Sequence, residues 1–264
     1  MMRLSVSNIA WSAENDGEML AFLRDNGFSG LEIAPTRIFP EAPYEKKEDA
    51  KAFAEQLRME FGLKVCSMQS IWYGKTQNIF GSHEEKNELL NYTNKASDFA
   101  EAISCNNLVF GCPKNRNRPE GEIEESVIDF FRIIADYAHE HNTAIALEPN
   151  PVIYGTNFIN TTQDAFAFVK KVASPGFKVN IDMGTILYNK ESFAQIENNF
   201  EYVNHVHISE PGLERIAITN LHRELAVLLR RCQYKGYVSL EMKNLGDLQE
   251  VKTAALEMKE VFGE

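Results

Sequence analysis

The sequence predicts a single α/β domain, residues 1–264, folded as a (β/α)8 TIM barrel. Short β-type runs alternate with longer amphipathic helical stretches from one end of the chain to the other, eight of each. No Pro/Gly/Ser-rich linker, low-complexity tract or block of like charge interrupts this alternation. Because alternating elements imply a parallel sheet, eight such units in a chain of 264 residues most simply close into a barrel.

The predicted strands are short runs rich in β-branched and aromatic residues. In chain order they span Leu4–Ser7, Gly30–Ile33, Lys64–Gln69, Asn107–Phe110, Thr143–Glu148, Phe177–Asp182, Val203–Ile208 and Tyr237–Met242. An open, doubly wound sheet is the structural alternative. It is disfavoured because the first strand ends in SVSNIAW, with no G-x-G-x-x-G motif after it.

The predicted helices rest on apolar residues spaced three and four apart, as in Phe130, Ile133, Ile134 and Tyr137. In chain order they span Asp16–Asn26, Tyr44–Phe61, Glu84–Ile103, Ile123–His141, Thr162–Val172, Ser192–Asn199, Asn220–Cys232 and Leu248–Phe262.

Alternation along the strands indicates which side chains face the barrel interior. In the segment AIALEPN, Ile145 and Leu147 share one face, and Ala146 and Glu148 share the other. The segments SGLEIAP, KVNIDMG, NHVHISE and YVSLEMK repeat this parity. The branched apolar side chains are therefore expected to pack under the helices, and the small and polar ones to point inward.

Four residues at the C-terminal ends of four consecutive predicted strands form the strongest functional signal, because barrel active sites are built at that end. They are Glu148, Asp182, His207 and Glu241. Three converging carboxylates repel one another unless a cation neutralises them. We therefore expect one divalent metal ion, Mn²⁺ first, with Mg²⁺, Co²⁺ or Zn²⁺ as alternatives. The structural alternative is that each residue pairs separately with basic side chains or backbone amides.

The blocks GLEIAP, IALEPNP, VNIDMG, VNHVHISE and VSLEM resemble the xylose isomerase-like TIM barrel superfamily over essentially the whole chain. The sugar phosphate isomerase/epimerase branch, with the ketose 3-epimerases and hydroxypyruvate isomerases, is the most similar. The resemblance implies that Glu148, Asp182, His207 and Glu241 are metal ligands. It also implies that Glu148 and Glu241 are a catalytic acid/base pair. A homodimer is possible, because barrels of this type often dimerise.

The activity implied by this resemblance is a metal-dependent isomerase or epimerase of a small sugar, sugar phosphate or related hydroxy-carbonyl compound. The reaction would transfer a proton through a metal-stabilised enediolate. Three departures affect the substrate pocket. Thr185 and Leu213 stand where similar ketose 3-epimerases carry a histidine and an arginine, with Arg215 close by, and PGLERIAITNLH replaces a G-x-G stretch.

Further residues in or after the predicted strands are candidates for substrate contact, each with a structural alternative. They are Glu32, Trp72, Lys114, Arg116, Asn150, Asn157 and Glu210.

These candidates suggest different contacts. Glu32 would bond a sugar hydroxyl or a basic residue, and Glu210 would orient His207 or face solvent. The loop GCPKNRNRPEG would receive a phosphate or carboxylate, or be a solvated charged loop. Trp11, Trp72 and Tyr73 would shield the reacting group or pack in the core, and His205 is expected to be an interior histidine.

Composition argues against two classes of partner, and the resemblance implies a small carbohydrate-like substrate. The net charge of −11 and pI of about 5.1 disfavour nucleic acid and anionic membranes, which attract basic patches. The four scattered cysteines, the absence of a signal-like N-terminus and the absence of a long apolar run lead us to expect a cytoplasmic protein.

Three other functions stay open from the sequence. A metal-dependent lyase or dehydratase of a polyol ketone would use the same ligands, and a non-catalytic sugar sensor would have lost activity. An abasic-site endonuclease-like phosphodiesterase would need extra histidines, and the segments SMQSIWYG and FGCPKNR, with Thr185, offer none.

Overall fold

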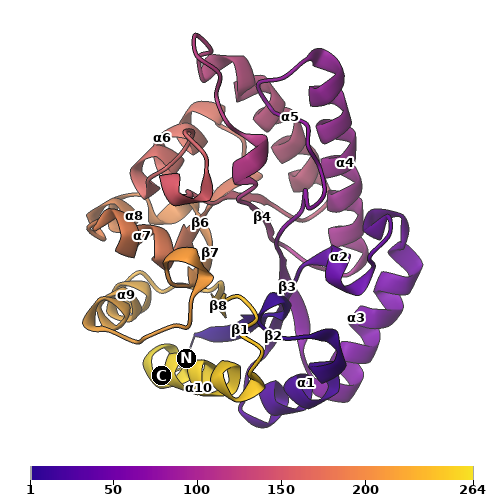
Figure 1. Ribbon diagram of the computed structural model, residues 1–264, viewed down its shortest axis with the longest axis vertical. Coiled ribbons are helices and arrows are strands. Elements are labelled where there is room, and N and C mark those ends of the chain that lie inside the picture. The colour runs from indigo at the N-terminus through magenta and orange to yellow at the C-terminus, as the bar shows by residue number, and fades with distance from the viewer. Residues whose placement is uncertain (1, 264) are drawn as a thin grey trace.

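Eight parallel strands pair in chain order, and β8 pairs with β1 to close the barrel that the sequence predicts (Figure 1). The computed structural model describes residues 2–263. The strands are β1 (Arg3–Ser7), β2 (Gly30–Ile33), β3 (Lys64–Met68), β4 (Leu108–Phe110), β5 (Ile145–Leu147), β6 (Phe177–Asp182), β7 (Val203–Ile208) and β8 (Tyr237–Leu240). Each observed strand end lies within two residues of its predicted position.

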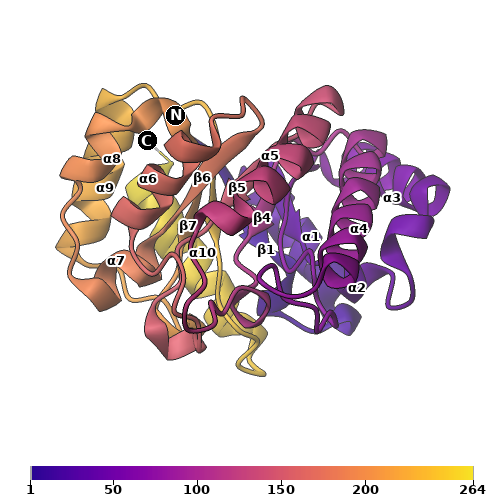
Figure 2. The same ribbon diagram turned by 90° about the horizontal axis from the view of Figure 1, so that it is seen from above.

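The helices form a layer around the strands, on several sides of the barrel (Figure 2). Those that correspond to predicted helices are α1 (Asp16–Asp25), α3 (Lys47–Phe61), α4 (His83–Ala102), α5 (Glu125–Glu140), α6 (Thr162–Val172), α8 (Ala194–Asn198), α9 (Asn220–Arg231) and α10 (Leu248–Phe262). Within the described residues, no helix combines the length and the apolar composition needed to cross a membrane.

Two short helices, α2 (Pro35–Ile38) and α7 (Met183–Asn189), were not predicted. Helix α7 begins directly after β6, where the Asp182 carboxylate accepts a hydrogen bond from Thr185 N at 2.7 Å. Its first four residues are all buried, so α7 has no polar face in its first turn to mark it as a helix. The predicted helix 44–61 is also divided, into a 3-10 turn (Pro43–Glu45) and α3.

The barrel interior is polar, which confirms the predicted parity of the strands. The apolar side chains Val6, Val206 and Leu240 are fully buried in the surrounding core. The inward side chains instead bond one another across the barrel. These bonds include Ser5 Oγ with Ser239 Oγ (2.6 Å), Gln69 Nε2 with Ser7 Oγ (2.6 Å) and Asn107 Nδ2 with Ser67 Oγ (2.9 Å).

One glycine makes room for a large side chain inside the barrel. A Cβ at Gly30 would lie 2.6 Å from the Tyr237 ring and 2.8 Å from Cys66 Sγ, closer than carbon atoms approach in proteins. The Tyr237 ring therefore occupies the space that β2 leaves free, near the N-terminal ends of the strands. This packing helps to close the end of the barrel away from the cluster of acidic residues.

Aromatic side chains join the barrel to the helices on one side. The Phe131 ring on α5 lies 5.1 Å from Phe110 on β4 and 5.2 Å from Phe168 on α6, both edge-on. Trp72 stacks edge-on against Phe110 at 4.7 Å, and its Nε1 donates to Thr93 Oγ1 on α4 at 2.8 Å. These contacts fix the strand ends from which the loops of the site extend.

Candidate metal centre

Four side chains from consecutive strands meet at the C-terminal end of the barrel. Glu148 directly follows β5, Asp182 ends β6, His207 lies in β7 and Glu241 directly follows β8. All four are buried, and each offers one ligand atom within 4.8 Å of the ligand atoms of the other three. The structure thus brings together the four residues that the sequence singled out.

His207 is at the centre of this cluster. Its Nδ1 lies 2.8 Å from Glu148 Oε1 and 3.1 Å from Glu241 Oε2. A single N–H can donate well to only one of two carboxylates. The carboxylates of Glu148 and Glu241 therefore both converge on His207 Nδ1. Such a convergence of two carboxylates and an imidazole nitrogen is typical of residues that share one cation.

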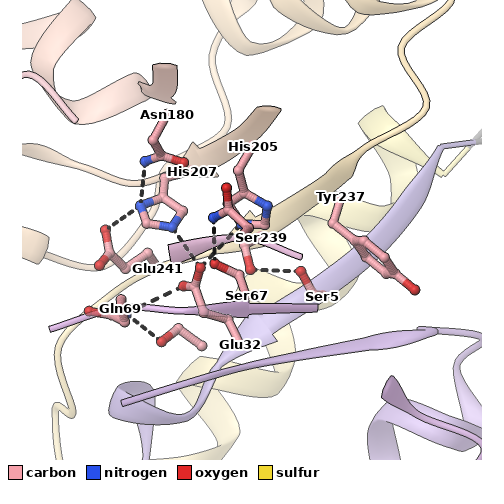
Figure 3. A network of polar contacts seen from close by, with 12 residues as sticks. Ser5, Glu32, Ser67, Gln69, Asn180, His205, His207, Tyr237, Ser239 and Glu241 are labelled. Carbon is pink, nitrogen blue, oxygen red and sulfur yellow. Dashed lines mark hydrogen bonds and ion pairs between the residues drawn. The ribbon is translucent and has the colours of Figure 1, made fainter. Parts of the chain in front are cut away.

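Glu32 lies on the other side of the His207 ring, inside the barrel (Figure 3). Its Oε2 is 2.9 Å from His207 Nε2 and 3.1 Å from His205 Nε2, and all three side chains are almost completely buried. A carboxylate only accepts hydrogen bonds, so Glu32 holds the proton of neutral His207 on Nε2. That leaves the lone pair of Nδ1 directed at Glu148 and Glu241.

Charge inside the barrel shifts the pKa values of these groups. Burial lowers the pKa of His207, but the charges of Glu241 and Glu32 outweigh burial and raise it well above its ordinary value. Burial raises the pKa of Glu32, yet the two histidines bring it well below its usual range. For His205, burial dominates and lowers the pKa.

Asp182 is held rigidly by its neighbours. One carboxylate oxygen accepts from the hydroxyl of Ser209, and the other accepts from Thr185 N (2.7 Å) and Thr185 Oγ1 (2.6 Å). Burial, followed by the charge of Glu148, raises the pKa of Asp182. Burial also raises the pKa of Glu241. Both shifts express the cost of placing several carboxylates in one dry site.

Glu148 is positioned by amides and by a buried cation. Its Oε1 accepts from Asn180 Nδ2 at 2.7 Å, and its Oε2 accepts from Asn150 Nδ2 at 3.1 Å. The Arg116 guanidinium, which is fully buried, donates to Glu148 O at 3.0 Å and to Asn150 Oδ1 at 2.9 Å. Gly111 leaves the necessary room, since a Cβ there would lie 2.8 Å from Glu148 Oε2.

The donor set fits a divalent cation. Three carboxylates and one imidazole suit Mn²⁺ or Mg²⁺, and also Co²⁺ or Zn²⁺. Two ligand atoms that each lie about 2.1 Å from an ion are at most about 4.2 Å apart, so atoms within 4.8 Å of one another need at most a small contraction. The raised pKa of His207 indicates that, without a cation, a proton takes its place between the carboxylates.

A cleft of about 180 Å³ opens over the cluster and is lined by Glu148, Asp182 and Glu241. Its walls come from Val109 on β4 and from the segments that follow the strands, namely Gln69, Ser70, Gly111, Cys112, Pro113, Asn150, Tyr154 and Leu213. Ser70, Cys112 and Leu213 have positive φ angles of 54°, 43° and 54°. Such backbone strain in non-glycine residues tends to cluster at functional sites.

The substrate-contact candidates from the sequence lie in different places. Asn150 lines the cleft, whereas Glu32 is buried beneath the cluster and Trp72 packs among core aromatic side chains. Lys114 and Asn157 are exposed on loops outside the cleft lining.

The sequence left open whether Glu210 orients His207. In the structure, Glu32 is the residue that contacts His207 Nε2. Glu210 Oε1 accepts from the backbone N–H of Ala217 at 3.3 Å. His205 is an interior histidine, as expected, and lies against Glu32.

Two of the three sequence departures, at Thr185 and Leu213, have structural explanations. The Thr185 hydroxyl bonds Asp182 and lies 2.8 Å from Pro149 O, so it supports the cluster from behind. Leu213 lines the cleft, where it contributes an apolar wall. Arg215 instead pairs with Glu250 and, at 3.5 Å, with Glu257 on α10, so it does not take the place of a cleft arginine.

Several residues of the site were not singled out from the sequence. Gln69, Ser70 and Cys112 line the cleft, and Asn180 and Ser209 bond the clustered carboxylates. Asn180 shares the inward parity of Asp182, which was the available signal for it. The others lie in or beside loops, where strand alternation no longer indicates the direction of a side chain.

Solved structures similar to this chain include two sugar epimerases. A D-psicose 3-epimerase in the presence of D-fructose has a TM-score of 0.79 and 16% identity, and the match covers 100% of both chains. A 3-keto-D-glucoside 4-epimerase from E. coli has a TM-score of 0.76 and 20% identity, with 97% of this chain and 98% of that chain covered.

A family 2 AP endonuclease from Brucella melitensis is also similar, with a TM-score of 0.75 and 21% identity over 97% of this chain and 98% of that chain. At such identities these likenesses show the fold alone. No curated protein matches the chain.

A family model described as Xylose isomerase-like TIM barrel matches residues 20–261. The match includes strands β2 to β8 and all four clustered side chains at the end of the barrel. The sequence resemblance and the closed eight-stranded barrel agree with it. The chain therefore belongs to the xylose isomerase-like TIM barrel family.

Proposed function

We propose that this chain is a divalent-metal-dependent isomerase or epimerase of a small, unphosphorylated sugar or related hydroxy-carbonyl compound. One observation carries the proposal: Glu148, Asp182, His207 and Glu241 place their ligand atoms within 4.8 Å of one another at a cleft. Membership of the family and the fold shared with two sugar epimerases support it.

Glu148 and Glu241 are the proposed acid/base pair. A divalent cation bound by the cluster would polarise the substrate carbonyl and favour loss of the neighbouring proton. Both glutamates line the cleft, and they approach it from β5 and β8, with β6 and β7 between them. One carboxylate removes the proton next to the carbonyl, and the other returns a proton. Return to the same carbon from the other face gives an epimer, and return to the neighbouring carbon gives an isomer.

The neighbours of Glu148 keep its carboxylate oriented during this transfer. Arg116 holds Asn150 Oδ1 at 2.9 Å, so the amide of Asn150 turns its N–H₂ toward Glu148 Oε2. Because the same guanidinium also holds Glu148 O, the side chain and the backbone of the glutamate are fixed together.

The charges around the cleft favour an unphosphorylated substrate. Among the described residues, none that lines the cleft is a lysine or an arginine. Arg116 is completely buried and already donates to three acceptors, and Lys114 and Arg118 are exposed and do not line the cleft. A phosphate in this cleft would meet three carboxylates and no free cationic side chain.

A lyase acting on a polyol ketone would use the same proton abstraction and then expel a hydroxyl group. An isomerase or epimerase gives a product of unchanged composition, whereas a lyase gives an unsaturated product that absorbs ultraviolet light. The phosphodiesterase alternative is disfavoured because the cluster offers a single imidazole and the Thr185 side chain bonds Asp182.

Metal content is the first test. We expect elemental analysis to find about one Mn, Co or Zn ion per chain of purified protein. The ion should be lost in His207→Ala and kept in His139→Ala, since His139 is exposed on α5. A native protein that holds no metal after reloading would contradict the proposal, and about three zinc ions per chain would favour the phosphodiesterase.

Exchange of solvent deuterium then tests the chemistry. A set of ketoses and aldoses incubated with the metal-loaded protein in D₂O should take up deuterium next to the carbonyl, as measured by NMR. Glu148→Gln and Glu241→Gln should each lower the exchange rate by about a hundredfold or more, which is the usual contribution of a positioned acid or base.

A further inference from the structure

A second cavity, of about 480 Å³, lies beside the cleft over the four clustered residues, at the same end of the barrel. Its lining residues follow β1, β2 and β3, whereas the clustered ligands belong to β5–β8. Ser70, which follows β3, lines both the second cavity and the metal cleft. The two spaces therefore lie side by side, with Ser70 in the lining of both.

Two aromatic rings shape the second cavity. The Trp11 side chain is fixed because its Nε1 donates to Asp16 Oδ1 at 2.8 Å and the Arg37 guanidinium lies 5.6 Å from its ring. Tyr73 is 71% exposed, so its ring is accessible to a ligand in the cavity that it lines. Its backbone N–H donates to Ser70 O at 2.9 Å. Ser70, with its positive φ, therefore forms the turn that presents Tyr73.

The remaining lining residues indicate an uncharged, hydroxylated ligand. Arg37 is the charged residue of this lining, and Asp16 neutralises it through contacts of 2.6 Å and 3.1 Å. Ser12, Thr36 and Ser70 supply hydroxyl groups. A sugar ring has an apolar C–H face that packs on an aromatic ring and hydroxyl groups that need hydrogen-bond partners, so it matches this combination.

We propose that the second cavity binds a sugar ring joined through a glycosidic bond to the reacting sugar. The substrate is then an uncharged glycosyl sugar rather than a free monosaccharide. The inference rests on the proposed function, which places the reacting sugar in the smaller cleft over the metal cluster. The second cavity, at about 480 Å³, is larger than the cleft, at about 180 Å³, so it has room for a ring attached to the reacting sugar.

Calorimetric titration of the metal-loaded protein with two ketoses tests the inference. The first probe is D-fructose, and the second is isomaltulose, which is D-fructose with a glucosyl ring on its terminal hydroxyl group. We expect isomaltulose to bind about tenfold more tightly, the effect of about 1.4 kcal/mol from ring packing. Tyr73→Ala should reduce this preference to about twofold, and Tyr73→Phe should retain most of it.

Tyr188→Ala is the matched control, because Tyr188 is also a partly exposed tyrosine but lines neither cavity. It should keep the full preference for isomaltulose. The inference is overturned if isomaltulose binds no more tightly than D-fructose, if isomaltulose shows no saturable binding at about 10 mM, or if Tyr73→Ala keeps the preference.

Deuterium exchange into the two sugars distinguishes a failure of the second-ring site from a failure of the proposed function. Metal-dependent exchange without a Tyr73-dependent preference overturns the second-ring site and leaves the function intact. A Tyr73-dependent preference without exchange into either sugar overturns the proposed function and leaves the binding site.

Discussion

Glu32 is completely buried beneath the proposed metal ligands, where its Oε2 lies 2.9 Å from His207 Nε2. By accepting the Nε2 proton, it leaves Nδ1 of the neutral imidazole free to bind a cation. A glutamine at this position has the same size but can donate through its amide and so can favour the other tautomer. Glu32 therefore acts through His207 and does not itself line the cleft.

We predict that Glu32→Gln weakens metal binding by about 10–100-fold, the usual effect of losing such a partner. Glu201→Gln, on an exposed part of the chain, should leave the affinity unchanged. Competition of each protein against a fluorescent metal chelator measures both affinities. Equal affinities in the two variants would show that Glu32 does not orient His207.

Glu32 and Arg116 show that the sequence did not predict the contact partners of individual side chains. Strand parity placed Glu32 inside the barrel, but whether it met a sugar or a histidine depended on the position of β7, far along the chain. Arg116 was expected in a cationic loop, yet its guanidinium is enclosed by acceptors from Glu148, Asn150 and Ile159. Neither partner set can be obtained from local sequence, because it is assembled from separate loops.

At the scale of elements, helix α9 begins with an unusual cap. Thr219 N donates to His222 Nδ1 at 3.1 Å, so the neutral imidazole accepts at the positive end of the helix. His222 Nε2 is buried without a hydrogen-bond partner in the described structure. Burial lowers the pKa of His222 from 6.5 to about 4.

This shift predicts a loss of stability in acid. Between pH 6.5 and pH 4 the unfolded chain binds the proton and the folded chain does not, so the free energy of unfolding falls as the pH is lowered. The loss at pH 5 relative to pH 7 should be on the order of 1–2 kcal/mol from this group. Urea unfolding at the two pH values should show a smaller pH dependence for His222→Gln, whereas His139→Gln, changed at an exposed histidine, should match the native protein.

Helices were predicted correctly where the apolar pattern extends over several turns, and a helix was missed where the pattern is short. The 11 residues of α6 and the 15 residues of α10 have the predicted ends. The seven residues of α7 escape prediction because its first turn is buried and its cap, Asp182, also has the pattern of a metal ligand. The same carboxylate both starts this helix and points an oxygen into the cluster.

For the whole molecule, metal binding should be linked to thermal stability. A ligand that binds only the folded chain at about a hundred times its Kd adds about 2.7 kcal/mol of stability. In a chain of this size, that corresponds to a rise in Tm of about 5–10 °C. We therefore expect chelation to lower Tm by this amount in scanning calorimetry.

His207→Ala distinguishes binding at the site from general effects of cations. The chain carries a net charge of −11, so divalent cations also reduce its overall self-repulsion. That effect should be equal in the variant and in the native protein. A chelation shift of the same size in His207→Ala would show that the cluster does not hold the metal.

The sequence by itself determined the barrel, the polar interior and the four residues of the cluster, because these follow from periodicity within each strand and from the shared position of strand ends. Tertiary structure alone decided which side chains surround that cluster. Glu32 became the partner of His207, Thr185 a support of Asp182, and Ser70 a residue in the lining of both cavities. The physical reason is that closing the barrel brings β2 against β7 across its interior and sets loops of irregular backbone side by side, and no local repeat in the chain encodes those contacts.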